Sequence, residues 1–264
     1  MIVFRIPGSY GEERERGVDA MGYASQQFFL QKRDVGVVAP VLCTMRILYE
    51  DDIDEAVFFH KRITDEIGDE GFFAEENTIA ESIRGEGAVT GIFAEGRLIA
   101  LRAVSYVKEY VDDAAEDLGI DPGEANNVAV MDFCVTDSAF RGNNIQFFTY
   151  LFMENILYPN RYHLHTTVSP KNIFSLSNVL KCGFHAVRFK NKYGGHPRFV
   201  LYKNLRRPVA VMTRGHKEIL LRNYDYHPKV FGDGFVGYKV KHKSTGMAML
   251  YGKPLAVEAE PKAS

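Results

Sequence analysis

The stretch Thr136-Asp-Ser-Ala-Phe-Arg-Gly-Asn-Asn-Ile-Gln146 joins two apolar segments of this 264-residue chain. The segment before it, 127–136, is apolar with few charges, which predicts a central strand. The segment after it, 145–157, has the broad apolar face of a helix. The first turn of a helix has unpaired backbone N–H groups and partial positive charge, so it attracts anions. The stretch therefore predicts an anion site between a strand and a helix.

Four residues inside this stretch favour phosphate as the anion. Gly142 allows a ligand to approach the backbone closely, and Asn143 and Asn144 adopt left-handed conformations more readily than most residues. Arg141 adds a fixed positive charge. The alternative interpretation is an ordinary strand-to-helix loop with an Asn-rich turn.

A second strand–loop–helix unit follows. Residues 161–168 predict a strand, and Ser169-Pro170 then combines a helix-capping residue with a proline suited to the first helical position. Gly183 suits the position just after a helix. These signals predict a helix at about 170–182.

The rest of the chain predicts further strands and helices around these two units. Strands are expected at 41–48, 88–94, 97–107, 184–192 and 198–204, and helices at 53–67 and 78–85.

The ends of the chain and one insertion lack this regular pattern. Residues 1–40 predict an N-terminal arm with a short helix at 24–31, and the acidic insertion 109–126 predicts a loop with a helical turn. The basic extension 206–264 contains the segments 235–240 and 247–251, which predict an accessory hairpin.

Both motifs resemble those of the GNAT superfamily of N-acetyltransferases. Arg141-Gly-Asn-Asn-Ile-Gln146, led by Phe140, is similar to its acetyl-CoA motif, arginine-glycine-x-glycine-x-glycine or alanine. Asn172-Ile-Phe-Ser175, followed by Gly183-Phe184, resembles its second motif, in which an asparagine opens a helix that ends in glycine-phenylalanine. The resemblance covers about 45–205, and the expected element order is the family's.

The resemblance implies an α/β (α+β) GNAT acyltransferase fold, with a mixed central sheet flanked by helices. It places an N-terminal arm at 1–40, the acetyltransferase domain at 41–205 and a C-terminal accessory extension at 206–264. It also implies an acyl-CoA-dependent N-acyltransferase that moves acetyl from acetyl-CoA, or another acyl group from its acyl-CoA, directly to an amine without a metal. The residues that it assigns to the co-substrate are Cys134, Val135, Thr136, Phe140, Arg141, Gly142, Asn143, Asn144, Ile145, Gln146, Asn172 and Ser175.

The sequence departs from the family's pattern at three positions. Asn144 and Gln146 stand where the first motif has its later glycines, and Gln146 adds bulk there unless it points away from the phosphates. Val179 occupies the position where many members have a tyrosine that protonates the leaving thiolate. Valine cannot donate a proton, so the acid is missing or the proton comes from water or another group. A tyrosine at this position is expected to fit only if that helix face opens toward the co-substrate.

Transfer to an amine requires a base. An alkyl ammonium group has a pKa near 10.4, so its deprotonation at pH 7 costs about 4–5 kcal/mol. Asp132 is the only acidic residue of the predicted central strand and is the expected general base. Strand alternation predicts that it shares a face with Cys134 and Thr136. The alternative is a hydrogen-bonded structural carboxylate.

The other reactive side chains suit structural positions better. Cys134 is interpreted as a small buried residue, because the resemblance implies direct transfer rather than an acyl-cysteine. His163 and His165 alternate on one strand face, but no matched carboxylates or cysteines accompany them. The turn at 193–196 lies near the expected substrate side, although Gly194-Gly195 suits any hairpin turn.

Charge is distributed unevenly along the chain, whose formal net charge is −2. Residues 50–126 hold 21 acidic and 6 basic residues, whereas residues 127–264 hold 8 acidic and 20 basic residues. This asymmetry indicates an anionic co-substrate on the second part and a cationic acceptor on the first, or simply two solvated surfaces.

The composition excludes several classes of protein. The chain has 3 cysteines, which lie far apart and argue against a disulfide framework or a CxxC metal site. It has no apolar run of membrane length, no signal-peptide pattern and no nucleic-acid motif. The expected partner is a small-molecule or peptide amine, a homodimer is compatible with the sequence, and the expected location is the cytoplasm.

Two alternative functions remain open. One is a GNAT-like module that binds acyl-CoA with weak catalysis, which Val179 and the missing glycines favour. The other is an acyl-homoserine lactone synthase, which shares the fold. The chain has no tryptophan, however, whereas the N-terminal region of that family characteristically carries one.

Overall fold

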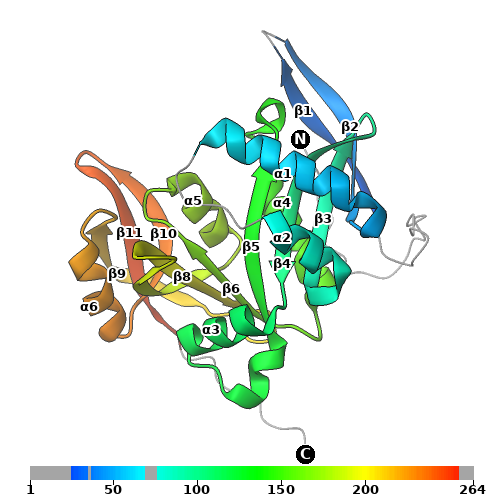
Figure 1. Cartoon of the computed structure of the whole chain (residues 1–264). Helices are drawn as coiled ribbons and strands as arrows, with labels where there is room; N and C mark the ends of the chain where they lie inside the picture. Colours follow the sequence, from blue (N-terminus) through cyan, green and yellow to red (C-terminus); the bar gives the residue numbers. More distant parts are fainter. Residues whose placement is uncertain (1–24, 35–36, 69–75, 256–264) are drawn as a thin grey trace, which may run out of the picture.

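A mixed sheet of 11 strands forms the centre of the computed structural model (Figure 1). The structure describes residues 25–34, 37–68 and 76–255. The strand order is β1-β2-β3-β4-β5-β6-β8-β7-β10-β11-β9, and among the described strands only β5 and β6 form a parallel pair. The predicted fold class, a mixed central sheet flanked by helices, is confirmed.

The strands are β1 Gln26–Asp34, β2 Val37–Ile47, β3 Gly87–Ala94, β4 Arg97–Ser105, β5 Val128–Thr136, β6 His163–Val168, β7 His185–Lys192, β8 His196–Asn204, β9 Val211–Leu220, β10 Val236–Lys243 and β11 Gly246–Pro254. The α-helices are α1 Ile53–Ile67, α2 Glu76–Glu81, α3 Lys108–Leu118, α4 Ile145–Leu157, α5 Ile173–Lys181 and α6 His227–Gly232. None of these helices has the length and apolar character that a membrane crossing needs.

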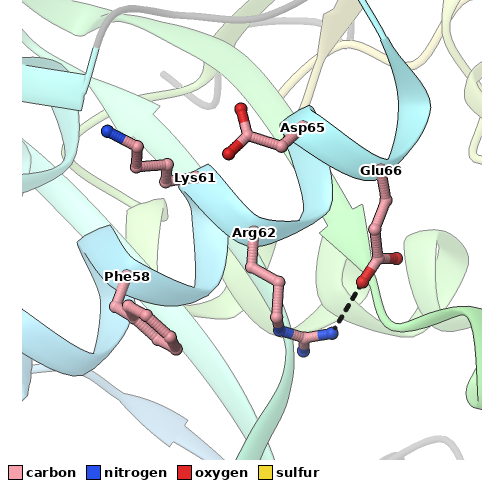
Figure 2. A pocket seen from close by; sticks show the side chains of 5 residues that line it. All are labelled: Phe58, Lys61, Arg62, Asp65 and Glu66. Carbon is pink, nitrogen blue, oxygen red and sulfur yellow. Dashed lines mark hydrogen bonds and ion pairs between the residues drawn. The ribbon is translucent and has the colours of Figure 1, made fainter.

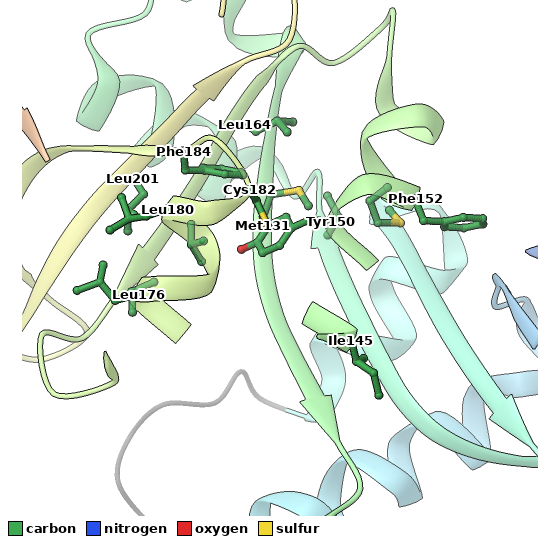
Figure 3. Packing of buried hydrophobic residues seen from close by; sticks show 14 of the residues in the cluster. Met131, Ile145, Tyr150, Phe152, Leu164, Leu176, Leu180, Cys182, Phe184 and Leu201 are labelled. Atoms are coloured by element: carbon green, nitrogen blue, oxygen red, sulfur yellow. The ribbon is translucent and has the colours of Figure 1, made fainter. Parts of the chain in front are cut away.

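The two faces of the sheet have separate cores. On one face, α4 and α5 pack on β5 and β6, with Tyr150, Leu176 and Leu180 clustered around Met131 and Leu164 (Figure 3). On the other face, α1 and α2 cover β3, β4 and β5, and α3 packs beside them on β5. Apolar burial of this extent is the main term that stabilises such a layered domain.

The acidic insertion is more regular than its composition predicts. A loop with a helical turn was expected at 109–126, but α3 is a full helix that ends at Gly119 in a left-handed cap. Val111, Ala114 and Ala115 are buried at i, i+3 and i+4 spacing, so a narrow apolar stripe docks the helix on β5. The many acidic residues around this stripe are the reason why the sequence predicts a loop here.

The expected short helix at 24–31 is wrong, because residues 26–34 form strand β1. Leu30 is buried and Phe28 packs on the ring of Phe148 in α4, whereas Phe29 and Gln31 are exposed. This alternation has the period of a strand rather than that of a helix. The N-terminal arm is therefore a β-hairpin with β2 over the described residues, while 1–24 lie outside them.

The C-terminal extension is larger than the hairpin that the sequence predicts. Strands β10 and β11 pair as expected, but β9 adds a third strand and α6 covers them. Gly237 of β10 pairs with Ala186 of β7, which joins the extension to the main sheet. A Cβ at Gly237 would lie 3.0 Å from that of Ala186 and 2.8 Å from Met249 Sδ, so glycine permits this close joint.

Candidate active site

Strands β5 and β6 separate in the middle of the sheet. They pair only from Val128–Val130 to His163–His165, although β5 continues to Thr136 and β6 to Val168 (Figure 1). Beyond His165, β6 continues to pair with β8, which lies on its other side. Helices α4 and α5 follow the ends of these two strands, so both helix N-termini lie where the strands diverge.

A β-bulge lies beside this divergence. Arg102 of β4 pairs with Cys134, and Val104 pairs with Met131, so Asp132 and Phe133 together oppose the single residue Ala103. A bulge leaves an extra residue unpaired in the ladder and redirects the side chains around it. Strand β5 therefore changes its pairing at Asp132.

The bulge overturns the prediction that Asp132 shares a face with Cys134 and Thr136. Met131 belongs to the core under α4, and Cys134 Sγ lies 3.9 Å from Thr149 Oγ1 of α4, so these two residues share one face. Phe133 packs on the ring of His60 of α1, on the opposite face. Alternation from Met131 places Asp132 on the face of α1 and α3. Simple parity failed because the bulge inserts a residue between Met131 and Cys134.

The Asp132 carboxylate is half-buried and has no hydrogen-bond or ion-pair partner in the described part of the chain. Burial raises the pKa of Asp132 to about 7. A hydrogen-bonded structural carboxylate would instead have partners and a lower pKa. A carboxylate with these properties could act as a general base, because a base works best with a pKa near the working pH.

The loop after β5 turns sharply into α4. Gly142 has φ 84° and Asn144 has φ 57° and ψ 28°, so both residues are left-handed. Phe140 and Ile145 are buried and anchor the two ends of the turn in the core. The backbone N–H groups of residues 142–146 have no hydrogen-bond partner among the described residues. They form the cradle of unpaired donors that the sequence predicts.

Asn143 differs from the prediction in its backbone conformation and in the partners of its side chain. It is not left-handed, and its side chain bonds the open edge of β1: Gln31 N donates to its Oδ1 at 2.9 Å, and its Nδ2 donates to Gln31 O at 2.8 Å. Arg62 of α1 holds the other end of the loop through Asp137, at 2.9 Å. The loop is therefore fixed from two sides, which preorganises its N–H groups. Sequence reasoning missed Gln31 and Arg62 because their contacts span long stretches of chain.

The side chain of Gln146 points to α5 and not to the cradle. Its Nε2 donates to Ser175 Oγ at 3.1 Å, and its Oε1 accepts from Asn178 Nδ2 at 3.0 Å. This link joins the first turn of α4 to the first two turns of α5, so the bulk of Gln146 leaves the N–H groups open. Ser175 thus serves the link between the helices.

Asn172 begins α5, as the resemblance implies. Its Oδ1 accepts from Ser175 N at 3.0 Å, which makes it the N-cap. The predicted cap at Ser169 with Pro170 inside the helix is wrong. Ser169 instead caps a preceding turn, in which its carbonyl accepts from Asn172 N at 3.0 Å.

Val179 is 1% exposed and packs between Leu176 and Leu180 in the core under α4 and α5. Its side of α5 therefore faces the interior of the core.

We expect Val179→Tyr to lower the free energy of unfolding by about 1–3 kcal/mol, because a phenol overpacks this core. Urea unfolding measures the loss, and Phe174→Tyr on the same helix is the control, since Phe174 is 86% exposed. A Val179→Tyr chain as stable as the control would show that this helix face has room for the family's usual acid.

A hydroxyl pair lies on the same sheet face as Asp132. Thr167 of β6 alternates with Leu164 and Val168 of the α4 core, so it points to the α3 face, where its Oγ1 lies 3.1 Å from Tyr193 OH. Tyr193 comes from the turn between β7 and β8, has φ 53° and is 62% exposed. The turn at 193–196 therefore meets β6 on the expected substrate side.

The two strand histidines each bond a carboxylate, which was not expected from the sequence. His165 Nε2 lies 3.3 Å from Asp117 Oδ2, and His163 bonds Tyr202 and Glu124. Burial lowers the pKa of His165, although Asp117 opposes this shift. Within residues 25–34, 37–68 and 76–255, no set of His, Cys, Asp and Glu side chains is arranged to hold a metal ion.

A surface hollow of about 540 Å³ lies on α1 (Figure 2). It is lined by Phe58, Lys61, Arg62, Asp65 and Glu66. On a helix, Phe58 and Lys61 lie opposite the buried stripe of Ala56, Phe59 and Ile63, so the hollow faces solvent. We therefore assign it no part in the chemistry.

Comparison with known proteins gives neighbours only among solved structures; no family model and no curated protein matches the chain. An acetyltransferase of the GNAT family from Streptococcus pneumoniae is 12% identical, with a TM-score of 0.45 over 61% of this chain and 99% of that chain. The ribosomal-protein-S18-alanine N-acetyltransferase from Escherichia coli is 14% identical, with a TM-score of 0.44 over 62% and 94%. Aminoglycoside acetyltransferase AAC(6')-Ib, in complex with coenzyme A and kanamycin, is 14% identical, with a TM-score of 0.45 over 62% and 95%. Because these values are low, we base the functional proposal on this chain's own residues.

Proposed function

We propose that this chain is an acyl-CoA-dependent N-acyltransferase of the GNAT superfamily, which transfers acetyl from acetyl-CoA directly to an amine. One observation carries the proposal. The partnerless Asp132, with a pKa raised to about 7, lies on the strand that runs into a cradle of unpaired N–H groups. Asp132 lies at the start of the segment 132–136, and the N–H cradle follows its end. A base and an anion site placed in this way suit a reaction between an amine and a phosphate-bearing acyl donor.

The residues of the loop fit the phosphates of coenzyme A. The N–H groups of 142–146 point out of the first turn of α4, whose partial positive charge favours an anion by about 0.3–1 kcal/mol. Arg141 is exposed beside them, and its Nε donates to Thr136 O at 3.3 Å. The remaining donors of its guanidinium are available to phosphate.

The acyl group would lie near the bulge. Coenzyme A contributes an activated thioester, and the chain's task is to orient it and to manage protons. The unpaired side of β5 from Asp132 onward has free backbone groups where it parts from β6. Such groups hold a thioester carbonyl in place and stabilise the charge that develops on its oxygen.

Asp132 would take the proton from the acceptor amine. It faces α1 and α3, the region that holds the chain's excess of acidic residues, so a cationic amine is drawn to its side of the sheet. Cys134 faces α4 on the opposite side and contacts Thr149. This separation supports direct attack by the amine over an acyl-cysteine intermediate.

The leaving thiolate needs another proton source, because the valine at position 179 has no proton to donate. Tyr193 is a phenol on the acceptor side, and its bond to Thr167 holds its hydroxyl against β6. We propose Tyr193 or water for this step.

Acetyl-CoA should stabilise the folded chain. A ligand at 100 times its dissociation constant adds about 2.7 kcal/mol, because it binds only the folded state. Thermal unfolding with acetyl-, propionyl- and longer acyl-CoAs at millimolar concentration measures the shift, with free pantetheine as the control for the phosphates. An unchanged melting temperature with every acyl-CoA would remove the proposed co-substrate.

The second candidate is an acyl-CoA-binding module with weak catalysis. The observation that favours it is Val179, a buried residue without an acidic proton at the position of the family's usual acid. Both candidates predict the thermal shift, and only the enzyme predicts release of free coenzyme A when amines are added.

A further inference from the structure

Arg33 of β1 lies against the loop at Gly142. A Cβ built on Gly142 would be 3.1 Å from Arg33 Nη2 and 3.3 Å from both Cζ and Nη1. Because these three distances are nearly equal, the flat face of the guanidinium covers the Gly142 backbone. Its N–H donors then point outward around the rim and stay available to a ligand.

The N-terminal hairpin holds Arg33 in this place. The side chain of Asn143 bonds both the N–H and the carbonyl of Gln31, two residues before Arg33 on the same strand. These bonds fix the register of β1 against the loop, while Phe28 packs on Phe148 of α4 from the other face of the strand. The position of Arg33 is therefore set by packing and by hydrogen bonds.

No carboxylate neutralises Arg33 in the part of the chain that the structure describes. Asp137 at the start of the loop pairs with Arg62 at 2.9 Å, and Glu95 pairs with Lys32, the neighbour of Arg33, at 3.5 Å. Arg141 likewise has no acidic partner among the described residues, and its Nε bonds only a carbonyl. Two guanidinium groups that have no counter-ion among the described side chains thus border one short loop, and like charges this close favour a shared anion.

We infer that Arg33 and Arg141 form a two-sided clamp on the diphosphate of the acyl-CoA, so that the N-terminal hairpin is part of the co-substrate site. This inference rests on the proposed function. Arginine suits the task because its planar fork donates paired hydrogen bonds to phosphate oxygens. The motif in the loop and the motif in α5 did not indicate Arg33, which is more than 100 residues from Gly142 in the sequence.

Binding of acetyl-CoA by the full chain tests the clamp. Arg33→Ala should raise the Kd for acetyl-CoA about tenfold by titration calorimetry, and Arg141→Ala should do the same. Arg33→Lys should fall between wild type and Arg33→Ala, because lysine keeps the charge without the fork. Lys32→Ala is the matched control, since Lys32 is the adjacent cation on β1 and is already paired with Glu95. It should change the Kd less than twofold.

Three other ligands separate the diphosphate from the rest of coenzyme A. Dephospho-CoA keeps the diphosphate, so Arg33→Ala should weaken it as much as it weakens acetyl-CoA. Pantetheine has no phosphate, so its Kd should not change. Adenosine 3′,5′-bisphosphate carries two separate phosphates and should be weakened less than dephospho-CoA.

Two results would overturn the clamp while leaving the proposed function intact. One is an Arg33→Ala chain that binds acetyl-CoA with the same Kd as the wild-type chain. The other is an equal loss for pantetheine, which would mean that Arg33 only supports the loop. Failure of the wild-type chain to bind any acyl-CoA would instead overturn the proposed function, and the clamp with it.

Discussion

Asp132→Asn should lower kcat/KM for acetyl transfer by about 10²–10⁴-fold at pH 7, the usual span for the loss of a general base. Burial raises the pKa of Asp132 to about 7, so wild-type kcat/KM should rise with pH until the carboxylate is ionised. The variant should lack this rise, and its deficit should shrink at high pH, because the amine then loses its proton without help. Initial rates of free-thiol release between pH 6 and pH 9.5 measure both effects.

The same substitution should raise the free energy of unfolding at pH 8, although it lowers activity. A carboxyl whose pKa is raised by folding binds its proton more tightly in the folded state, so wild-type stability falls as pH rises from about 4 through 7. Asp132→Asn removes this fall and should be the more stable chain at pH 8. Asp112→Asn on α3 is the control, since Asp112 pairs only with exposed Lys108. An active Asp132→Asn enzyme with an unchanged pH profile would return Asp132 to a structural role.

Asp117→Asn should lower the free energy of unfolding by about 3–5 kcal/mol, because removing one member of a buried charge cluster leaves the others uncompensated. Asp117 is 1% exposed and bonds His165, Lys190 and Lys192. Burial alone would raise its pKa, but these three partners outweigh burial and hold the pKa well below its usual value. The cluster ties α3 to β6 and β7 beside the acceptor face.

The pH dependence of this effect has a definite sign. A carboxylate with a depressed pKa stabilises the fold above its ordinary pKa of about 3.9 and loses that contribution as the pH falls toward the depressed value. Urea unfolding of wild type and Asp117→Asn should therefore differ most near pH 7 and converge in acid. Asp113→Asn is the control, since Asp113 is an exposed partner of Lys192 and its loss should cost under about 1 kcal/mol. Equal losses in the two variants would mean that the cluster is not a buried one.

The part of the site that lies within one short segment was predictable from the sequence. Gly142 and Asn144 have the conformational freedom that the turn needs, and both are left-handed in the structure. The family resemblance identified Asn172 as the residue that opens α5, and it is the N-cap, whereas the local capping signals favoured Ser169. The left-handed turn follows from local backbone chemistry, which the sequence shows directly.

The features that depend on partners could not be predicted in this way. The bulge at Asp132 arises from the pairing of β5 with β4, so parity along β5 alone gave the wrong face. The place of Arg33 depends on a side-chain bond between Asn143 and the edge of β1. A narrow stripe of Val111, Ala114 and Ala115 among acidic residues was too short to reveal α3. In each case the deciding contact joins segments that lie far apart in the sequence.

Transfer of acetyl from acetyl-CoA to an amine tests the central claim most directly. The full chain is incubated with acetyl-CoA and a panel of small-molecule and peptide amines at pH 7.5, with Asp132→Asn in parallel. Free thiol is measured with a colorimetric thiol reagent, and the products are identified by mass spectrometry. The account predicts that at least one amine gains an acetyl group, with one free coenzyme A for each, and that Asp132→Asn is slower by at least about 10²-fold. A wild-type chain that binds acetyl-CoA but releases no thiol above spontaneous hydrolysis with any amine would contradict it, and would leave a binding module in place of an enzyme.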